Sequence, residues 1–279
     1  MSIELPILPA ETRTRPAGVW EYISASRLNL WLKCPLAFKL KYIDGIVTPP
    51  SSSQFVGKMV HLGLERYYRQ LMMGRTLETT EVVHNMDQSW EAQATAEQVA
   101  FESCEDERGA RQQAQGLVNA YLAQLSNTEP RPLAVEASMG APLVHPITGE
   151  DLGVPLVGIV DLVLDSQHGP TIVDFKTAAR GGLFLDVIHE LQLSAYAYLY
   201  RNSAGLTESG LEIRQLIKTK VPKVERRVHV ARQERHFRRL FSVIRAYLDA
   251  LDSGQFPFRP GITCGYCEFV DRECREWMG

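Results

Sequence analysis

The sequence contains Gly158-Ile159-Val160-Asp161-Leu162-Val163-Leu164-Asp165 and, after a short turn at 165–170, Ile172-Val173-Asp174-Phe175-Lys176-Thr177. Both stretches are rich in β-branched and apolar residues, which predicts two consecutive strands joined in a hairpin-like pair. Each predicted strand carries one acid among apolar neighbours. Side chains two positions apart leave the same face of a strand, so Lys176 is expected beside Asp174.

These acids allow both a simple and a chemical interpretation. Asp161 could cap a loop at a strand end, and Asp174 with Lys176 could form an ordinary ion pair. A buried carboxylate without a partner is costly, however, and two neighbouring carboxylates repel unless a hard cation such as Mg²⁺ lies between them. A lysine beside such a cation could offset the charge on a reacting phosphate.

The composition is that of an ordinary globular protein. The chain has 279 residues, of which 45 % are hydrophobic and 23 % charged, which excludes a wholly disordered, collagen-like or coiled-coil chain. No apolar run approaches the roughly 18 residues that a membrane span needs. The N-terminus shows no basic head or apolar core of a secretion signal, so a cytoplasmic location is expected.

The charge is unevenly distributed, although the formal net charge is only −3. Residues 78–107 contain nine acids and neither Lys nor Arg, whereas 214–245 are strongly basic. Such a basic stripe could hold a phosphate backbone, or the two segments could be solvated helix faces of opposite sign. The candidates for backbone contact are Arg226, Arg227, Arg235, Arg238 and Arg239.

Five cysteines are present, and three of them lie near the C-terminus at Cys264, Cys267 and Cys274. Disulfides are rare in the cytoplasm, so this triplet favours a metal or an iron–sulfur cluster with Cys34 as fourth ligand. The spacing of the cysteines alone favours a zinc site and an iron–sulfur cluster about equally. A redox-active CxxC pair is less favoured than either. Either group would clasp the two ends of the chain. Cys104 is expected to be a buried apolar residue.

The remaining pattern predicts an α/β domain with a mixed central sheet. Residues 1–23 are expected to form an N-terminal arm, and 24–279 a single domain with a helical insert at about 78–126. Helices are expected from an N-cap at Ser24, at 54–73, as a pair within 87–125, at 189–201 and at 232–251. Strands are expected at 133–139, 154–165, 171–176, 211–219 and 224–230.

Four further polar residues are candidates for the same site. His61 lies on a predicted helix, where a lone histidine is more often a surface or packing residue. Gln192 and Tyr196 are four apart on a helix and so share a face, as they also would on an ordinary amphipathic helix. Glu136 is a strand carboxylate that could point toward the two acids.

In their order along the chain, these motifs resemble the PD-(D/E)xK nucleases of the RecB type. The resemblance is carried by Gly57-x3-His61, Gly158-Ile159-Val160-Asp161, Asp174-Phe175-Lys176 and Gln192-x3-Tyr196, and runs from about residue 24 to 276. The cysteine set is similar to the iron–sulfur subset of that family, which includes the AddB nuclease domain and CRISPR-associated RecB-like exonucleases. Asp174 stands where many relatives have Glu, and Val160-Asp161 where others have Pro-Asp.

The resemblance implies a restriction-endonuclease-like fold and a set of roles. Asp161, Asp174, the Phe175 carbonyl and His61 would bind Mg²⁺ or Mn²⁺, and Lys176 would be the catalytic lysine. Gln192 and Tyr196 would position DNA or the lysine. The ligands of a [4Fe–4S] cluster would be Cys34, Cys264, Cys267 and Cys274.

The expected function is therefore a metal-dependent deoxyribonuclease, an exonuclease on single-stranded DNA ends with a structural cluster. Helicase, CRISPR or recombination partners would be separate chains, because no GxxxxGK[ST] motif occurs. Two alternatives keep the same fold: a catalytically silent DNA-binding or partner subunit of a helicase–nuclease or CRISPR adaptation complex, and a zinc-bearing variant. A redox or regulatory protein would not need the two acids and the lysine.

Overall fold

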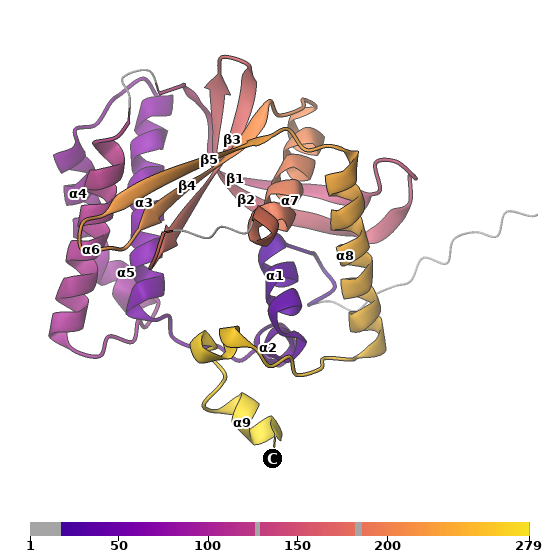
Figure 1. Cartoon of the computed structure of the whole chain (residues 1–279). Coiled ribbons are helices and arrows are strands. Elements are labelled where there is room, and N and C mark those ends of the chain that lie inside the picture. Colours follow the sequence, from indigo (N-terminus) through magenta and orange to yellow (C-terminus); the bar gives the residue numbers. More distant parts are fainter. Residues whose placement is uncertain (1–17, 126–128, 182–185, 279) are drawn as a thin grey trace, which may run out of the picture.

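The structure is a computed structural model that describes residues 18–125, 129–181 and 186–278 (Figure 1). Most of the expected N-terminal arm, up to residue 17, lies outside the described residues. The helices of the first half are α1 (Ala25–Lys33), α2 (Pro35–Phe38), the π-helical turn η1 (Lys39–Ile43), α3 (Ser52–Met72), α4 (Thr79–Gln88), α5 (Trp90–Ala96) and α6 (Cys104–Leu122).

The second half carries the sheet. Its strands are β1 (Pro132–Val144), β2 (Asp151–Ser166), β3 (Gly169–Ala178), β4 (Gly210–Ile217) and β5 (Lys223–Val230). Its helices are α7 (Asp186–Ala204), α8 (Glu234–Ser253), the 3₁₀ turn η2 (Ile262–Tyr266) and α9 (Glu273–Met278).

Within the described residues, five strands form one mixed sheet in the order β1-β2-β3-β4-β5. Every neighbouring pair is antiparallel except β3 and β4, which run parallel. A parallel pair needs a crossover connection, and α7 supplies it. The fold class expected from the sequence, a mixed sheet flanked by helices, is confirmed.

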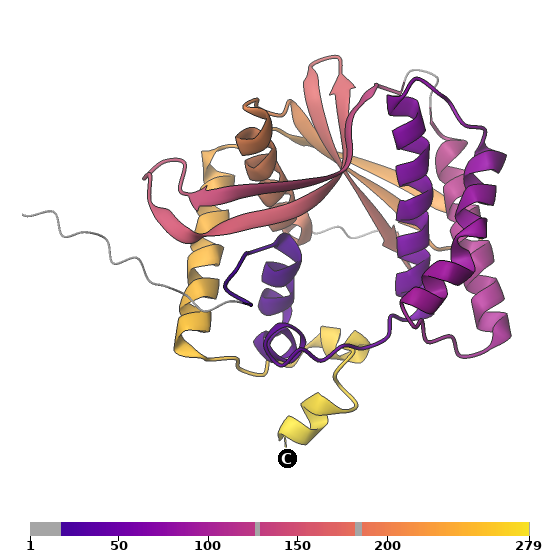
Figure 2. The ribbon, with the colours of Figure 1, turned by 180° about the vertical axis from the view of Figure 1, so that it is seen from behind.

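Helices cover both faces of this sheet (Figures 1 and 2). One core joins the sheet to α1, α7 and α8, and the other joins it to α3 and the helices α4–α6. Ile172 packs into the first core, whereas its neighbours Val173 and Phe175 pack into the second. The central strands are therefore buried on both sides, which explains their almost uninterrupted apolar sequence.

Helix α8 shows how the sequence produces these layers. Its buried residues recur every three or four positions and form one stripe, while the arginines face outward. The helix ends at Gly254, whose φ of 64° is a left-handed conformation that glycine adopts without strain. The buried stripe consists of Phe237, Leu240, Phe241, Ile244, Tyr247, Leu248 and Leu251.

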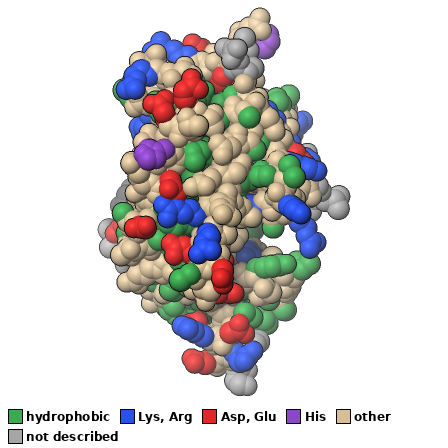
Figure 3. Space-filling model, turned by 90° about the vertical axis from the view of Figure 1, so that its left-hand side faces the viewer, with side chains coloured by type: hydrophobic (Ala, Val, Ile, Leu, Met, Phe, Trp, Pro, Cys, Tyr) green, Lys and Arg blue, Asp and Glu red, His purple; other side chains and the backbone are tan. Residues whose placement is uncertain are grey.

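The helical insert contains the pair of helices expected within 87–125, α5 and α6, and one further helix, α4, before them. Three helices, α4, α5 and α6, occupy 79–122, because the chain turns at Ser89 and again at 97–103. Part of its acidic run is neutralised by arginine, as where Arg111 donates to the Asp87 carboxylate. On the side of the molecule that carries the insert, acidic and basic side chains are interspersed (Figure 3). No helix in the described ranges is long and apolar enough to cross a membrane.

Candidate active site

The candidate site lies where strands β2 and β3 separate. Their hydrogen-bonded ladder runs only as far as the pair Leu162 and Val173, while β3 continues alongside β4. Asp161 and Asp174 are the next residues on the two strands. Asp161 Oδ2 accepts a hydrogen bond from the Phe175 backbone N–H at 2.8 Å, so its carboxylate spans the opening. The predicted hairpin-like pair therefore brings both acids to a fork in the sheet.

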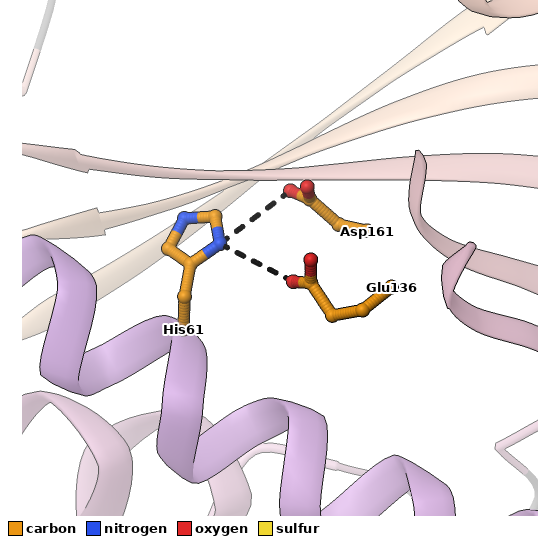
Figure 4. A group of neighbouring side chains, drawn as sticks. All are labelled: His61, Glu136 and Asp161. Carbon is orange, nitrogen blue, oxygen red and sulfur yellow. Dashed lines mark ion pairs between the residues drawn. The ribbon is translucent and has the colours of Figure 1, made fainter. Parts of the chain in front are cut away.

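Two side chains from other elements converge on Asp161 (Figure 4). His61 Nδ1, on α3, lies 3.8 Å from Asp161 Oδ2 and 3.8 Å from Glu136 Oε1 on β1. One ligand atom from each of the three residues lies within 4.8 Å of the other two. An imidazole and two carboxylates are suitable ligands for Mg²⁺ or Mn²⁺.

Glu136 reaches this group through an unusual backbone. Its φ is 45°, a left-handed conformation that costs a residue other than glycine about 1–3 kcal/mol. On β1 its neighbours Val135 and Ala137 pair with Leu162 and Val160, so Glu136 stands opposite Asp161. The surrounding ladder holds the strained residue in place, and strain of this kind is concentrated at functional sites.

Lys176 and α7 form the other side of the site. Lys176 Nζ donates to Asp174 Oδ1 at 2.8 Å, and the Gln192 amide donates to the same oxygen at 3.0 Å. Gln192 also donates to the Tyr196 hydroxyl at 2.8 Å. Asp174 is buried, and its Oδ2, which lies 2.8 Å from Lys176 Nζ, accepts no hydrogen bond from the described residues. A buried carboxylate oxygen without a hydrogen bond is suited to coordinating a cation.

The electrostatics of the site also favour a cation. Burial, and then the neighbouring charge of Asp174, raise the pKa of Asp161 to about 7. Burial lowers the pKa of His61, but the Glu136 and Asp161 carboxylates outweigh it and leave that pKa above its usual value. The protein holds these carboxylates together against their repulsion, and a divalent cation would relieve that repulsion.

The site opens into a groove of about 760 Å³. Glu136, Asp161, Lys176, Gln192 and Tyr196 line it. The groove continues past the first turn of α1 and along β1 and β2, where Tyr22, Ser24 and Ile159 face it. No spacing pattern in the sequence placed Tyr22 or Ser24 at this site, because a contact of the N-terminal segment with β2 brings them there.

Four cysteines meet at a second place, beneath α1 and α2. Cys34, Cys264, Cys267 and Cys274 line one cavity of about 110 Å³, and Cys34 is also the residue at the C-terminal end of α1. Burial raises the pKa of the Cys274 thiol, and the other three thiols raise it further. The expectation for Cys104 is wrong: it is exposed, because it lies in the first turn of α6 on the solvent side.

The predicted basic stripe is split between two elements. Arg226 and Arg227 lie on the edge strand β5, and the other three arginines lie on α8. Arg239 pairs with Glu190, and Arg238 with Glu234. Part of the stripe is therefore neutralised within the chain. The assignment of these five arginines to DNA contact stays a prediction.

The fold and this group of side chains together form a site able to hold a divalent cation. The chain belongs to the PD-(D/E)XK nuclease superfamily, whose sequence profile matches residues 22–275. Comparison with the curated proteins found no match.

A solved structure with a TM-score above 0.5 shares the fold. A “Putative exonuclease” from Eubacterium rectale aligns with a TM-score of 0.55 at 13% identity, over 98% of this chain and 94% of the other. The structure of SSO0001 aligns over 87% of this chain and 93% of the other, at 13% identity and a TM-score of 0.34.

Proposed function

We propose that this protein is a divalent-metal-dependent deoxyribonuclease of the RecB type, which acts as an exonuclease on the ends of single-stranded DNA. The observation that carries the proposal is the convergence of His61, Glu136, Asp161, Asp174 and Lys176 at the fork between β2 and β3. Neither a capped loop nor a lone ion pair would need this convergence.

The residues fit the metal that such chemistry requires. His61, Glu136 and Asp161, with Asp174 and the Phe175 carbonyl, would hold Mg²⁺ or Mn²⁺. The cation, when bound, would polarise the scissile phosphodiester and lower the pKa of an attacking water. Adding Glu136 to the expected ligands rests on its 3.8 Å distance from the His61 ring.

Side chains of this protein would position the substrate and stabilise the transition state. The Lys176 ammonium lines the groove beside Asp174, where it would donate a hydrogen bond to a phosphate oxygen and offset the charge that develops there. Gln192 orients Asp174 and Tyr196 at once through its two hydrogen bonds. The lysine and the acids would therefore be positioned before the substrate arrives.

The size of the groove supports the end of a single strand as substrate. Its volume of about 760 Å³ falls within the range of pockets that hold small ligands, about 300–1,000 Å³. Such a space accepts an unpaired strand end more readily than a duplex. The arginines of β5 and α8 would hold the backbone outside the groove. A helicase, CRISPR or recombination partner would be a separate chain.

The four cysteines would hold a structural [4Fe–4S] cluster. The choice of a cluster over a tetrahedral zinc site rests on the four thiols lining one cavity and on the resemblance of the cysteine set to the iron–sulfur subset of the family. The cluster would join α1 and α2 to the C-terminal segment.

Degradation of end-labelled DNA tests the activity. Lys176→Ala should lower the Mg²⁺- or Mn²⁺-dependent rate on single strands by at least about 100-fold, because it removes a charge that stabilises the transition state. Lys39→Ala is the control, since Lys39 pairs only with the exposed Asp44. Equal cutting by Lys176→Ala and the parent would overturn the assignment. Binding without cutting by the parent would favour the silent-subunit alternative.

The cysteine site needs its own test. Protein purified without oxygen should absorb near 400 nm and contain about four irons per chain. Cys274→Ser should lose this absorbance, because it removes one of the four ligands, while Cys104→Ser should keep it. One zinc per chain and no visible absorbance would show that the cluster assignment is wrong.

A further inference from the structure

The groove exists because β2 changes its partner. Toward its C-terminal end β2 pairs with β3, up to Leu162. Further back, Ile23 takes the position of β3: its N–H donates to the Pro155 carbonyl at 2.9 Å, and its carbonyl accepts from the Val157 N–H at 2.8 Å. The six steps along β2 from Leu156, which Ile23 faces, to Leu162 span about 20 Å. Between these two contacts, no other described strand pairs with this edge of β2, which lines the groove.

Tyr22 stands on the wall of the groove beside this contact. Its ring is held from behind by Arg27, whose guanidinium carbon lies 3.7 Å from the ring centroid. Arg27 is itself only 7 % exposed. It donates to the Tyr22 carbonyl at 2.7 Å and to the Val19 carbonyl at 3.2 Å. Pairing at Ile23 fixes the Tyr22 backbone, and the buried cation fixes its ring.

Apolar side chains also line the groove beside the acids. Ile159 is 52 % exposed on β2, and with Met139 of β1 it lines the same groove as Tyr22. A rigid aromatic ring and two apolar side chains, next to a group of phosphate-directed residues, match a ligand that is flat and apolar at one end and anionic at the other. An unpaired nucleotide has this chemistry.

We propose that Tyr22 is a substrate-specificity residue that stacks on an unpaired nucleobase in the groove. This inference rests on the proposed deoxyribonuclease function and adds a reason for its strand preference. The bases of a duplex are already stacked and paired. Only an unpaired base can therefore stack on Tyr22 without first losing base pairing and stacking within the duplex. The Arg27 contact keeps the ring ready to stack and lowers the entropy lost on binding.

Binding measured in the Lys176→Ala background tests the proposal without cleavage. The ligand is a single-stranded oligonucleotide carrying 2-aminopurine near its end. Stacking contributes about 1–3 kcal/mol per base, so Tyr22→Leu should weaken binding about 5- to 150-fold. Tyr22→Phe keeps the ring and should bind within about twofold of the background protein. Quenching of 2-aminopurine should persist with Phe and disappear with Leu. Leu206→Ala, which changes an exposed apolar side chain outside the groove, should change nothing.

An abasic ligand separates stacking from a merely structural role. When the last three nucleotides are abasic, the background protein should bind this ligand as weakly as Tyr22→Leu binds the normal strand. Tyr22→Leu should bind the abasic ligand no more weakly than that. A similar loss by Tyr22→Leu on both ligands would overturn the proposal, as would unchanged binding of the normal strand. If the parent binds DNA and Tyr22→Leu binds it equally well, only this inference is wrong. If the parent neither binds nor cleaves DNA, the proposed function is wrong as well.

Discussion

The substitution Asp161→Asn measures how much stability the protein gives up to hold its acids together. The carboxyl of Asp161 is buried beside Asp174, and its pKa is raised to about 7 from 3.8. Asparagine has nearly the same shape, and its side-chain oxygen can still accept the hydrogen bond from the Phe175 N–H. The substitution therefore removes the charge with little change in packing.

The pH dependence of the effect follows from the direction of the pKa shift. Below about pH 4 the carboxyl is neutral in both the folded and the unfolded protein. Between about pH 4 and 7 only the unfolded protein loses the proton, so the free energy of unfolding falls by about 1.4 kcal/mol per pH unit. Above pH 7 the loss is complete. The parent should therefore lose about 3 kcal/mol between pH 5 and pH 8 through Asp161, and the asparagine variant should not.

Urea unfolding in EDTA at pH 5 and pH 8, followed by tryptophan fluorescence, measures this difference. Asp165→Asn is the control, because Asp165 is exposed on the same strand and should contribute less than about 0.5 kcal/mol. If Asp161→Asn raises the free energy of unfolding by the same amount at both pH values, the reasoning is refuted. Added Mn²⁺ at 100 times its dissociation constant should stabilise the parent by about 2.7 kcal/mol and the variant much less.

Two further substitutions test how the fold supports the site. Arg214→Met should destabilise the protein by about 3–5 kcal/mol in urea, because it leaves two carboxylates buried without their cation; Arg69→Met, which breaks an exposed pair, should cost under about 1 kcal/mol. Gly158→Ala should cost about 1–3 kcal/mol and lower activity, since a Cβ there would lie 2.9 Å from Leu199 on α7. Gly140→Ala, whose nearest contact would be 3.8 Å, is the matched control, and an equal loss from both would contradict this account.

The buried network around Arg214 was not predictable from the sequence. Its guanidinium binds Glu129, Glu212 and the hydroxyls of Tyr68 and Tyr121, so it joins β4 to the helices α3 and α6. In the sequence this arginine appeared only as one member of a basic stripe. Charge counting cannot separate a buried arginine from an exposed one, because burial depends on contacts between distant segments.

Much of the fold was predictable, and the boundaries show why. The helix expected at 54–73 occupies Ser52–Met72, and the strand expected at 171–176 occupies Gly169–Ala178. The helix is long and strongly periodic, and the strand is a run of apolar and β-branched residues that follows a polar turn. Within the insert, the two helices predicted at 87–125 are present, but α4 was not predicted as a separate helix, because the break at Ser89 carries no Gly or Pro to mark it.

The sequence by itself determined that two adjacent strands carry Asp161, Asp174 and Lys176, because a run of apolar and β-branched residues and a polar turn are local features of a chain. Only the tertiary structure decided that the strands separate at these acids, that the strained Glu136 and His61 complete the group, and that Ile23 opens the groove beside Tyr22. These relations join segments far apart in sequence, and packing between distant elements leaves no periodic pattern in any one of them.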